Sequence, residues 1–239
     1  MFVHNPTITD YQYNETGNCA CQTQECVPLP SQQPPRPGKK QYLVVGDSVS
    51  MGYFSSLKES LQGGFDVVHA PGNNDNANWG RKCIKGWLGP DPSRWDVITF
   101  NHGLHDLAYP DNEHLDQQLY SKFLAEEIKA LQTNCPKAKL AWVATTPVPT
   151  NPPPQKGKDC TLIPGRLESQ VLLYNQYAAS TVAAAAGSAI PTIDIHSTIT
   201  DYCGAGYAQC NITQCAGPHF SKEGFAMLGQ AVAKAVSAL

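Results

Sequence analysis

The sequence predicts a three-layer α/β/α domain, in which helices cover both faces of a central parallel sheet of about five strands. Short apolar runs rich in β-branched residues alternate with longer segments whose apolar residues recur at intervals of three and four. Strands alternating with helices favour a parallel sheet, because each return to a parallel neighbour needs a crossover. The length of 239 residues suits one such domain.

Five segments are expected to form the strands. Each is a short apolar run bounded by turn residues or by a helical pattern, and the first ends abruptly at Gly46. The expected strands are Tyr42–Val45, Phe65–His69, Trp95–Asn101, Leu140–Ala144 and Ile190–Ile195.

Four helices are expected from the spacing of apolar residues, and the segment Ala70–Gly80 is predicted to be a loop because turn residues fill it. The first helix follows Ser48 and places Met51, Phe54, Leu57 and Leu61 on one face. The others are Leu115–Leu131, with Leu119, Phe123, Leu124, Ile128 and Leu131 inward; Arg166–Ala186; and Lys222–Leu239, with Phe225, Leu228, Val232 and Val236 inward.

Residues 1–40 differ in composition from the rest of the chain. They lack hydrophobic periodicity, contain three cysteines, and close with five prolines between positions 28 and 37. We interpret residues 1–40 as an extended arm held by its cysteines, and residues 41–239 as the folded domain.

The charge and hydrophobicity patterns exclude two classes of partner. The net charge is -3 and no basic run stands out, so we expect no nucleic acid. No apolar run approaches the roughly 20 residues that span a bilayer, so we expect no membrane span. Met1–Pro6 has no apolar signal core, and any secretion signal is therefore expected to have been removed or never present.

The nine cysteines indicate the compartment. They lack the paired C-x-x-C or His spacing of a zinc site, and we therefore predict disulfides, with one thiol left free or in an intermolecular bond. Asn14 and Asn211 each begin a glycosylation sequon near cysteines. Together these features predict a mature secreted glycoprotein, whose oligomeric state the sequence leaves open.

Ser48 lies where the first predicted strand turns into the first predicted helix. A side chain there is presented at the carboxyl end of a strand, where open α/β sheets place their sites. The N–H groups at the helix start can also stabilise a developing negative charge. Ser48 is therefore either a nucleophile or only the N-cap of the helix.

Three sequence blocks carry a resemblance to a known family. They are Gly46-Asp47-Ser48, Phe100-Asn101-His102-Gly103-Leu104-His105-Asp106-Leu107, and Pro218-His219-Phe220-Ser221-Lys222-Glu223-Gly224-Phe225. In this order and spacing they resemble the first, third and last blocks of the SGNH (GDSL-type) hydrolases, over residues 41–239. The resemblance implies a flavodoxin-like fold, Ser48 as nucleophile and His219 as general base, with no metal or cofactor.

The resemblance also implies an oxyanion hole. Its donors would be the backbone of Ser48, Gly72 in the loop after the second strand, the side chain of Asn73, and His105, which stands where the family usually has asparagine. Asn101 is an alternative donor. Asp47 and Asp106 are supporting residues that also suit a purely structural role as buried polar groups.

One element of the family pattern is missing. SGNH enzymes place an aspartate three residues before the histidine, and that position is Ala216. Three interpretations stay open: a backbone carbonyl holds the ring, a carboxylate such as Asp194 or Asp201 replaces the acid, or activity is weakened, by evolution or by deliberate substitution. Loss of such a carboxylate reduces turnover by about 10⁴ without abolishing it.

We therefore expect a secreted serine esterase that hydrolyses carboxylic esters, with a weak preference for acyl groups on carbohydrates. The loop Thr145–Pro164 is a candidate wall or lid for the substrate. The alternative is an SGNH-fold protein that binds a glycan or small ester without turning it over. A structural or adhesive role of the cysteine-rich arm is a third interpretation.

Overall fold

The computed structural model describes residues 26–107, 115–148, 166–185, 190–204, 210–213 and 218–239. They contain a five-stranded, wholly parallel sheet in the order β2-β1-β3-β4-β5, which confirms the predicted α/β class. The strands are β1 (Lys40–Val45), β2 (Phe65–His69), β3 (Val97–Phe100), β4 (Lys139–Val143) and β5 (Thr192–Ile193). The helices are α1 (Ser48–Leu61), α2 (Ala77–Trp87), α3 (Gln117–Asn134), α4 (Glu168–Ala185), α5 (Ile195–Cys203) and α6 (Lys222–Ser237), with a short 3-10 turn, η1 (Pro92–Arg94).

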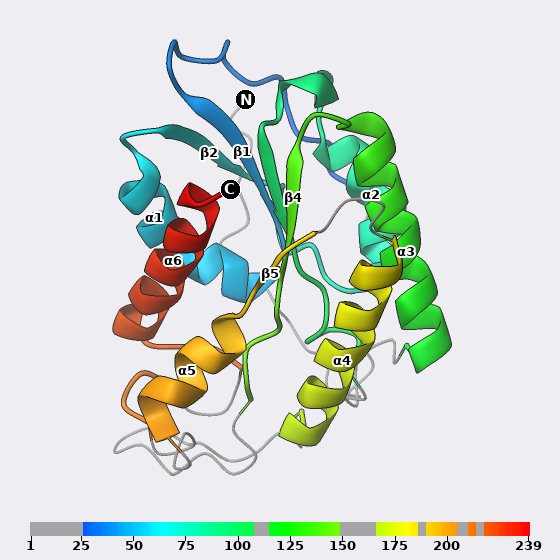
Figure 1. Cartoon of the computed structure of the whole chain (residues 1–239), viewed down its shortest axis with the longest axis vertical. Coiled ribbons are helices and arrows are strands. Elements are labelled where there is room, and N and C mark those ends of the chain that lie inside the picture. Colours follow the sequence, from blue (N-terminus) through cyan, green and yellow to red (C-terminus); the bar gives the residue numbers. More distant parts are fainter. Residues whose placement is uncertain (1–25, 108–114, 149–165, 186–189, 205–209, 214–217) are drawn as a thin grey trace, which may run out of the picture.

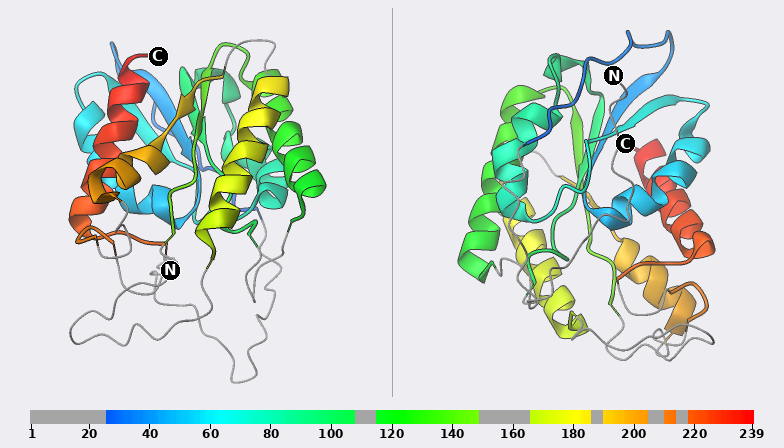
Figure 2. Two further views of the ribbon diagram at one scale, coloured as in Figure 1. Left: turned by 60° about the horizontal axis from the view of Figure 1, so that its bottom comes forward. Right: turned by 180° about the vertical axis from the view of Figure 1, so that it is seen from behind.

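The helices form two layers around the sheet. Figure 1 shows α1, α5 and α6 on one face and α2, α3 and α4 on the other, and Figure 2 shows the same layers from two further directions. Strands covered on both faces favour apolar residues at nearly every position, which explains why β3 is buried throughout and apolar except for Thr99, whose hydroxyl pairs with that of Tyr42. No helix in the described ranges is long and apolar enough to cross a membrane.

Close packing of α1 against α6 prepares the site. A Cβ at Gly229 would lie 2.7 Å from the Leu57 nitrogen and 2.8 Å from the Tyr53 carbonyl oxygen, so glycine permits this approach of the two helices. Ser48 begins α1, and His219 lies two residues before the N-cap of α6, Ser221. The helix pair therefore brings together two residues that are far apart in the sequence.

Two disulfides confirm the predicted use of cysteine. Cys26–Cys83 joins the N-terminal arm to α2, and Cys203–Cys210 joins the end of α5 to the segment that follows it. Among the described cysteines, Cys135 is free and buried, and burial raises the pKa of its thiol to about 11. The remaining cysteines lie outside the described residues: Cys19, Cys21, Cys160 and Cys215.

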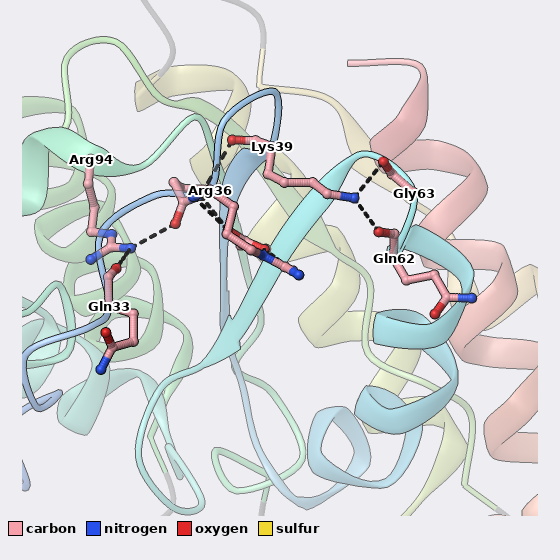
Figure 3. Close-up of polar contacts among 8 residues, drawn as sticks. Gln33, Arg36, Lys39, Gln62, Gly63 and Arg94 are labelled. Atoms are coloured by element: carbon pink, nitrogen blue, oxygen red, sulfur yellow. Dashed lines mark hydrogen bonds and ion pairs between the residues drawn. The ribbon is translucent and has the colours of Figure 1, made fainter.

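Polar contacts bind the described part of the arm to the amino end of the sheet (Figure 3). The Lys39 ammonium group donates to the carbonyl oxygens of Gln62 and Gly63, at 2.5 and 2.6 Å. The Arg94 guanidinium donates to the carbonyl oxygen of Gln33 at 3.0 Å. These contacts agree with an arm that is held down, while a division of the chain at residue 40 stays a prediction.

The prediction of a loop over residues 70–80 was wrong at its end, where α2 begins. Asn76 is the N-cap of α2, and its side-chain oxygen accepts from the Trp79 N–H at 3.1 Å. Asparagine is a favoured N-cap as well as a turn residue. The run of asparagines therefore masked a helix start.

The other corrections concern element ends and buried faces. β5 ends at Ile193 rather than Ile195, because Asp194 caps the unpredicted helix α5. Leu119 was predicted to face inward but is 40% exposed at the start of α3. On α1, the buried aromatic residue is Tyr53, whereas Phe54 is only partly buried. Caps and packing partners, which the spacing of apolar residues does not encode, decide these details.

Candidate active site

Ser48 is the first residue of α1, and its hydroxyl is not used as a cap. Asp47 is the N-cap: it is 1% exposed and its carboxylate accepts from the Val49 N–H at 2.9 Å. The interpretation of Ser48 as a cap is therefore wrong. The Ser48 hydroxyl oxygen instead lies 2.8 Å from Nε2 of His219.

The turn that presents Ser48 is fastened to the loop after β2. The Gly46 N–H donates to the side-chain oxygen of Asn74 at 2.8 Å, and the Asn74 N–H donates to the Gly46 carbonyl at 3.2 Å. A Cβ at Gly46 would lie 2.8 Å from the Ser50 hydroxyl oxygen, so a larger residue would disturb the turn. Asn74 is completely buried and was not predicted as a site residue.

His219 is positioned by the start of α6. Phe220 next to it is buried and pairs with Thr213 in an isolated antiparallel bridge, and the Ser221 N–H donates to the Ile212 carbonyl at 2.7 Å. Burial lowers the pKa of His219, while the charge of Asp47 raises it. The net lowering keeps the ring neutral at pH 7, as a base that receives the serine proton must be.

The described residues offer no hydrogen bond to Nδ1 of His219, and Ala216 lies outside them. Asp194 is exposed and accepts from the backbone N–H and the hydroxyl of Ser197, at 2.9 and 2.7 Å. Asp201 is also exposed. Both alternative acids therefore lie at the surface of α5, and Asp47 is the carboxylate whose charge supports the His219 imidazolium.

The residues predicted for the oxyanion hole have different surroundings. Gly72 is exposed with φ +71°, a conformation that suits glycine, whereas the Asn73 side-chain oxygen accepts from the Asp75 N–H at 3.0 Å. His105 is 20% exposed, and its Nδ1 lies 3.6 Å from the Asp75 carboxylate. Asn101 donates its amide protons to the carbonyl of Val143, the last residue of β4, and to the hydroxyl of Thr145, so it joins neighbouring strand ends.

Two further acidic residues are deeply buried behind this edge of the sheet. Asp106 accepts from the Ala77 N–H at 2.9 Å at the start of α2, and burial raises its pKa to about 8. Glu127 on α3 lies 3.0 Å from Nε2 of His102, and both side chains are fully buried. Asp106 thus binds the start of α2 as a buried polar group, whereas the pairing of His102 with Glu127 was not predicted.

Arg166 also belongs to this environment, although it was not predicted as a site residue. Its guanidinium donates to the Leu104 carbonyl, and its charge lowers the pKa of His105 and of His219. In the described part of the chain, His, Cys, Asp and Glu side chains form no group of three or more arranged to hold a metal ion. The Ser48 hydroxyl and the His219 imidazole, which lie in contact, are groups suited to nucleophilic attack and proton transfer.

Comparison with known proteins identifies the fold. No family model and no curated relative matches the chain. One similar structure is a Streptococcus pneumonia protein described as a platelet activating factor, with a TM-score of 0.66 and 16% identity over 83% of this chain and 84% of that chain. An acetyl xylan esterase has a TM-score of 0.61 and 13% identity over 82% of this chain and 99% of that chain. A GDSL-like lipase from Parabacteroides merdae has a TM-score of 0.59 and 12% identity over 84% of this chain and 98% of that chain. The chain therefore has the fold of the SGNH (GDSL-type) hydrolases.

Proposed function

We propose that this protein hydrolyses carboxylic esters through an acyl-enzyme on Ser48. The observation that carries the proposal is the 2.8 Å contact between the Ser48 hydroxyl and Nε2 of His219, at the carboxyl end of a parallel sheet. The contact joins a hydroxyl that is not used in capping to an imidazole whose lowered pKa leaves it ready to accept a proton. The fold shared with esterases and a lipase supports the same reaction class.

The first half of the reaction transfers the acyl group to the enzyme. His219 takes the hydroxyl proton as the Ser48 oxygen attacks the acyl carbon, and the carbonyl electrons move onto oxygen. The N–H of Ser48, which lacks an intrahelical partner in the first turn, stabilises that oxyanion together with Gly72, Asn73 and His105. The ester C–O bond then breaks, and the His219 imidazolium gives its proton to the leaving alcohol.

The second half returns the enzyme to its starting state. Water loses a proton to His219 and attacks the acyl carbon, and collapse of this second intermediate releases the carboxylic acid. The proton returns from His219 to the Ser48 oxygen. Asp47, buried beside the nucleophile, stabilises the transient imidazolium through its charge.

The substrate we propose is a small or carbohydrate ester, with O-acetyl groups on sugars favoured. The Asn-x-Gly-Leu-His-Asp variant in this chain and the structural likeness to an acetyl xylan esterase support this preference. Two disulfides support an extracellular location. We also propose glycosylation at Asn211, which is exposed, and at Asn14, which lies outside the described residues, as does most of the predicted loop Thr145–Pro164.

A second function, binding of a glycan or small ester without turnover, is favoured by one observation. Ala216 stands where the family has its aspartate, and an imidazole without that orienting carboxylate is a weaker base. The two functions differ in whether Ser48 is activated.

Labelling with a fluorophosphonate probe across pH tests that difference. We expect covalent modification of Ser48 that rises as His219 deprotonates, with an apparent pKa below 6.5. Ser48→Ala should abolish it, whereas Ser55→Ala, which removes an exposed hydroxyl from the same helix, should not. Absence of labelling at every pH would refute the esterase proposal and leave the binding function.

A further inference from the structure

Asp75 has an unusual backbone conformation that its neighbours maintain. Among the described residues it is the one non-glycine residue with a positive φ, at +56°. Such a conformation is strained for a residue with a side chain and persists only where the surroundings impose it. Here the Asp75 N–H donates to the Asn73 side chain and its carbonyl accepts from Nδ1 of His102, both at 3.0 Å.

The His102 ring that holds Asp75 is itself fixed by a buried ion pair. Burial alone lowers the pKa of His102, but the charge of Glu127 and its hydrogen bond raise it to about 9. The ring is therefore protonated at pH 7, and its two N–H groups donate to Glu127 and to the Asp75 carbonyl. Gly80 leaves room for the pair, since a Cβ there would lie 2.5 Å from both side chains.

The conformation of Asp75 directs its carboxylate toward the site. One carboxylate oxygen lies 3.6 Å from Nδ1 of His105, which is an ion-pair distance rather than a hydrogen bond. The side chains of Asp75 and His105 are 31% and 20% exposed, so solvent screens the contact only in part. Glu127, His102, Asp75 and His105 thus form a chain of contacts from the interior to the proposed oxyanion hole.

We propose that Asp75 is a positioning residue for the reaction: it holds His105 as the cationic donor to the acyl oxygen, and the Glu127–His102 pair holds Asp75. This inference deepens the proposed ester hydrolysis and rests on it. A neutral ring that keeps its proton on Nδ1, facing Asp75, has no proton on Nε2 to donate. The imidazolium carries a proton on each ring nitrogen, so His105 can donate to the acyl oxygen only while it is in this cationic form.

The charges around His105 oppose one another. Burial lowers its pKa, Asp47 and Asp75 raise it, and Arg166 and His102 lower it, with a net lowering. The reaction needs His105 protonated and His219 neutral, and both rings have lowered pKa values. We therefore expect kcat/KM to peak on the acid side, below about pH 6.5, and to fall toward alkaline pH as His105 loses its proton.

Asp75→Asn is the direct test. Asparagine keeps the size of the side chain and tolerates the left-handed conformation, but it removes the charge. In the full-length protein, NMR titration of the labelled imidazoles should show a lower His105 pKa in the variant. The alkaline limb of kcat/KM should move to lower pH in parallel, so that activity lost at pH 7 is recovered on acidification.

Two further variants make the result specific. Asp91→Asn removes a carboxylate near the amino end of the sheet and should change neither the His105 pKa nor the alkaline limb of kcat/KM. His105→Ala should lower kcat about 10²- to 10³-fold, the usual loss for one oxyanion donor, and should abolish the alkaline limb. Circular dichroism of each variant checks that the fold is intact.

The outcomes separate this inference from the proposed function. If Asp75→Asn leaves the His105 titration and the alkaline limb unchanged while Ser48 is still labelled, Asp75 does not position His105 and this inference alone is overturned. If Ser48 is never labelled at any pH, the proposed function is overturned and the catalytic role of Asp75 with it.

Discussion

The first turn of α1 carries two serine–histidine contacts that are nearly equal in length and different in surroundings. Ser48 lies 2.8 Å from His219, and Ser50 lies 2.7 Å from His69 at the end of β2. Ser50 is 3% exposed and its hydroxyl is shared between His69 and the Asp47 carbonyl oxygen, which also lies 2.7 Å away, whereas Ser48 is only partly buried and makes no cap. The two serines therefore differ in solvent exposure and in the partners of the hydroxyl. These two features, rather than the distance to a histidine, distinguish a candidate nucleophile.

The two histidines differ in the same sense. The His69 Nδ1–H donates to the Ala70 carbonyl, and its ring packs edge-on against Phe54 with centroids 5.5 Å apart. His219 lies in a short connection before α6 and contacts the hydroxyl that we propose as the nucleophile. One contact therefore fastens β2 to α1, and the other is available for proton transfer.

The largest expected effect is on turnover. His219→Gln should reduce kcat by about 10⁴ or more, because the general base of the proposed reaction is lost. His69→Gln should leave kcat within tenfold of the original value. Ester hydrolysis by the two purified variants measures both. An equal loss in the two would show that the contacts are not functionally distinct.

A smaller effect is expected on stability, and here the structural contact of Ser50 should matter more than that of Ser48. Ser50→Ala removes the hydroxyl between His69 and the Asp47 carbonyl and should cost about 1–3 kcal/mol, because buried polar groups lose a partner. Ser48→Ala should cost less than about 1 kcal/mol, since its hydroxyl is partly exposed and alanine suits the helix. Urea unfolding measures the loss of unfolding free energy in each variant. A larger loss for Ser48→Ala than for Ser50→Ala would contradict the comparison.

The residues of these two contacts were not equally predictable from the sequence. The strand–turn–helix at Ser48 is encoded locally, by an apolar run, a glycine and a helical pattern, and the motif around His219 is local as well. The contact of Ser50 with His69 joins the start of α1 to the far end of β2, so no local pattern reveals it. Long-range contacts depend on packing that becomes visible only in the folded chain.

The same limit applies to the fold and to the proposed oxyanion hole. The order and class of the long elements followed from periodicity, but α2 was hidden by asparagines and α5 by the short run before Asp194. The chain from Glu127 to His105 joins three segments that are distant in sequence, and the carbonyl of Asp75 within it is a backbone group. Side-chain patterns carry no information about such a partner.

The smallest expected effect is the pH dependence of stability. Burial lowers the pKa of His69, so between that pKa and the unfolded value of about 6.5 the unfolded chain binds more protons. This contribution to stability is complete above pH 6.5 and is lost as the pH falls. Removing it with His69→Gln should reduce the slope of stability against pH by up to about 1.4 kcal/mol per pH unit.

Urea unfolding between pH 5 and 7 measures that slope, and other titrating groups do not obscure it. Asp106, whose pKa is raised to about 8, is protonated in the folded state but ionised in the unfolded chain between pH 5 and 7. Here the folded state binds more protons, so the slope of stability against pH that Asp106 causes has the opposite sign. His102, with a pKa of about 9, is protonated in both states below pH 6 and changes stability only at higher pH. Both contributions are the same with and without His69, so the difference between the two proteins belongs to His69. Equal slopes would mean that His69 titrates as freely in the fold as in the unfolded chain, and its contact with Ser50 would then not be the buried structural bond that distinguishes it from Ser48 and His219.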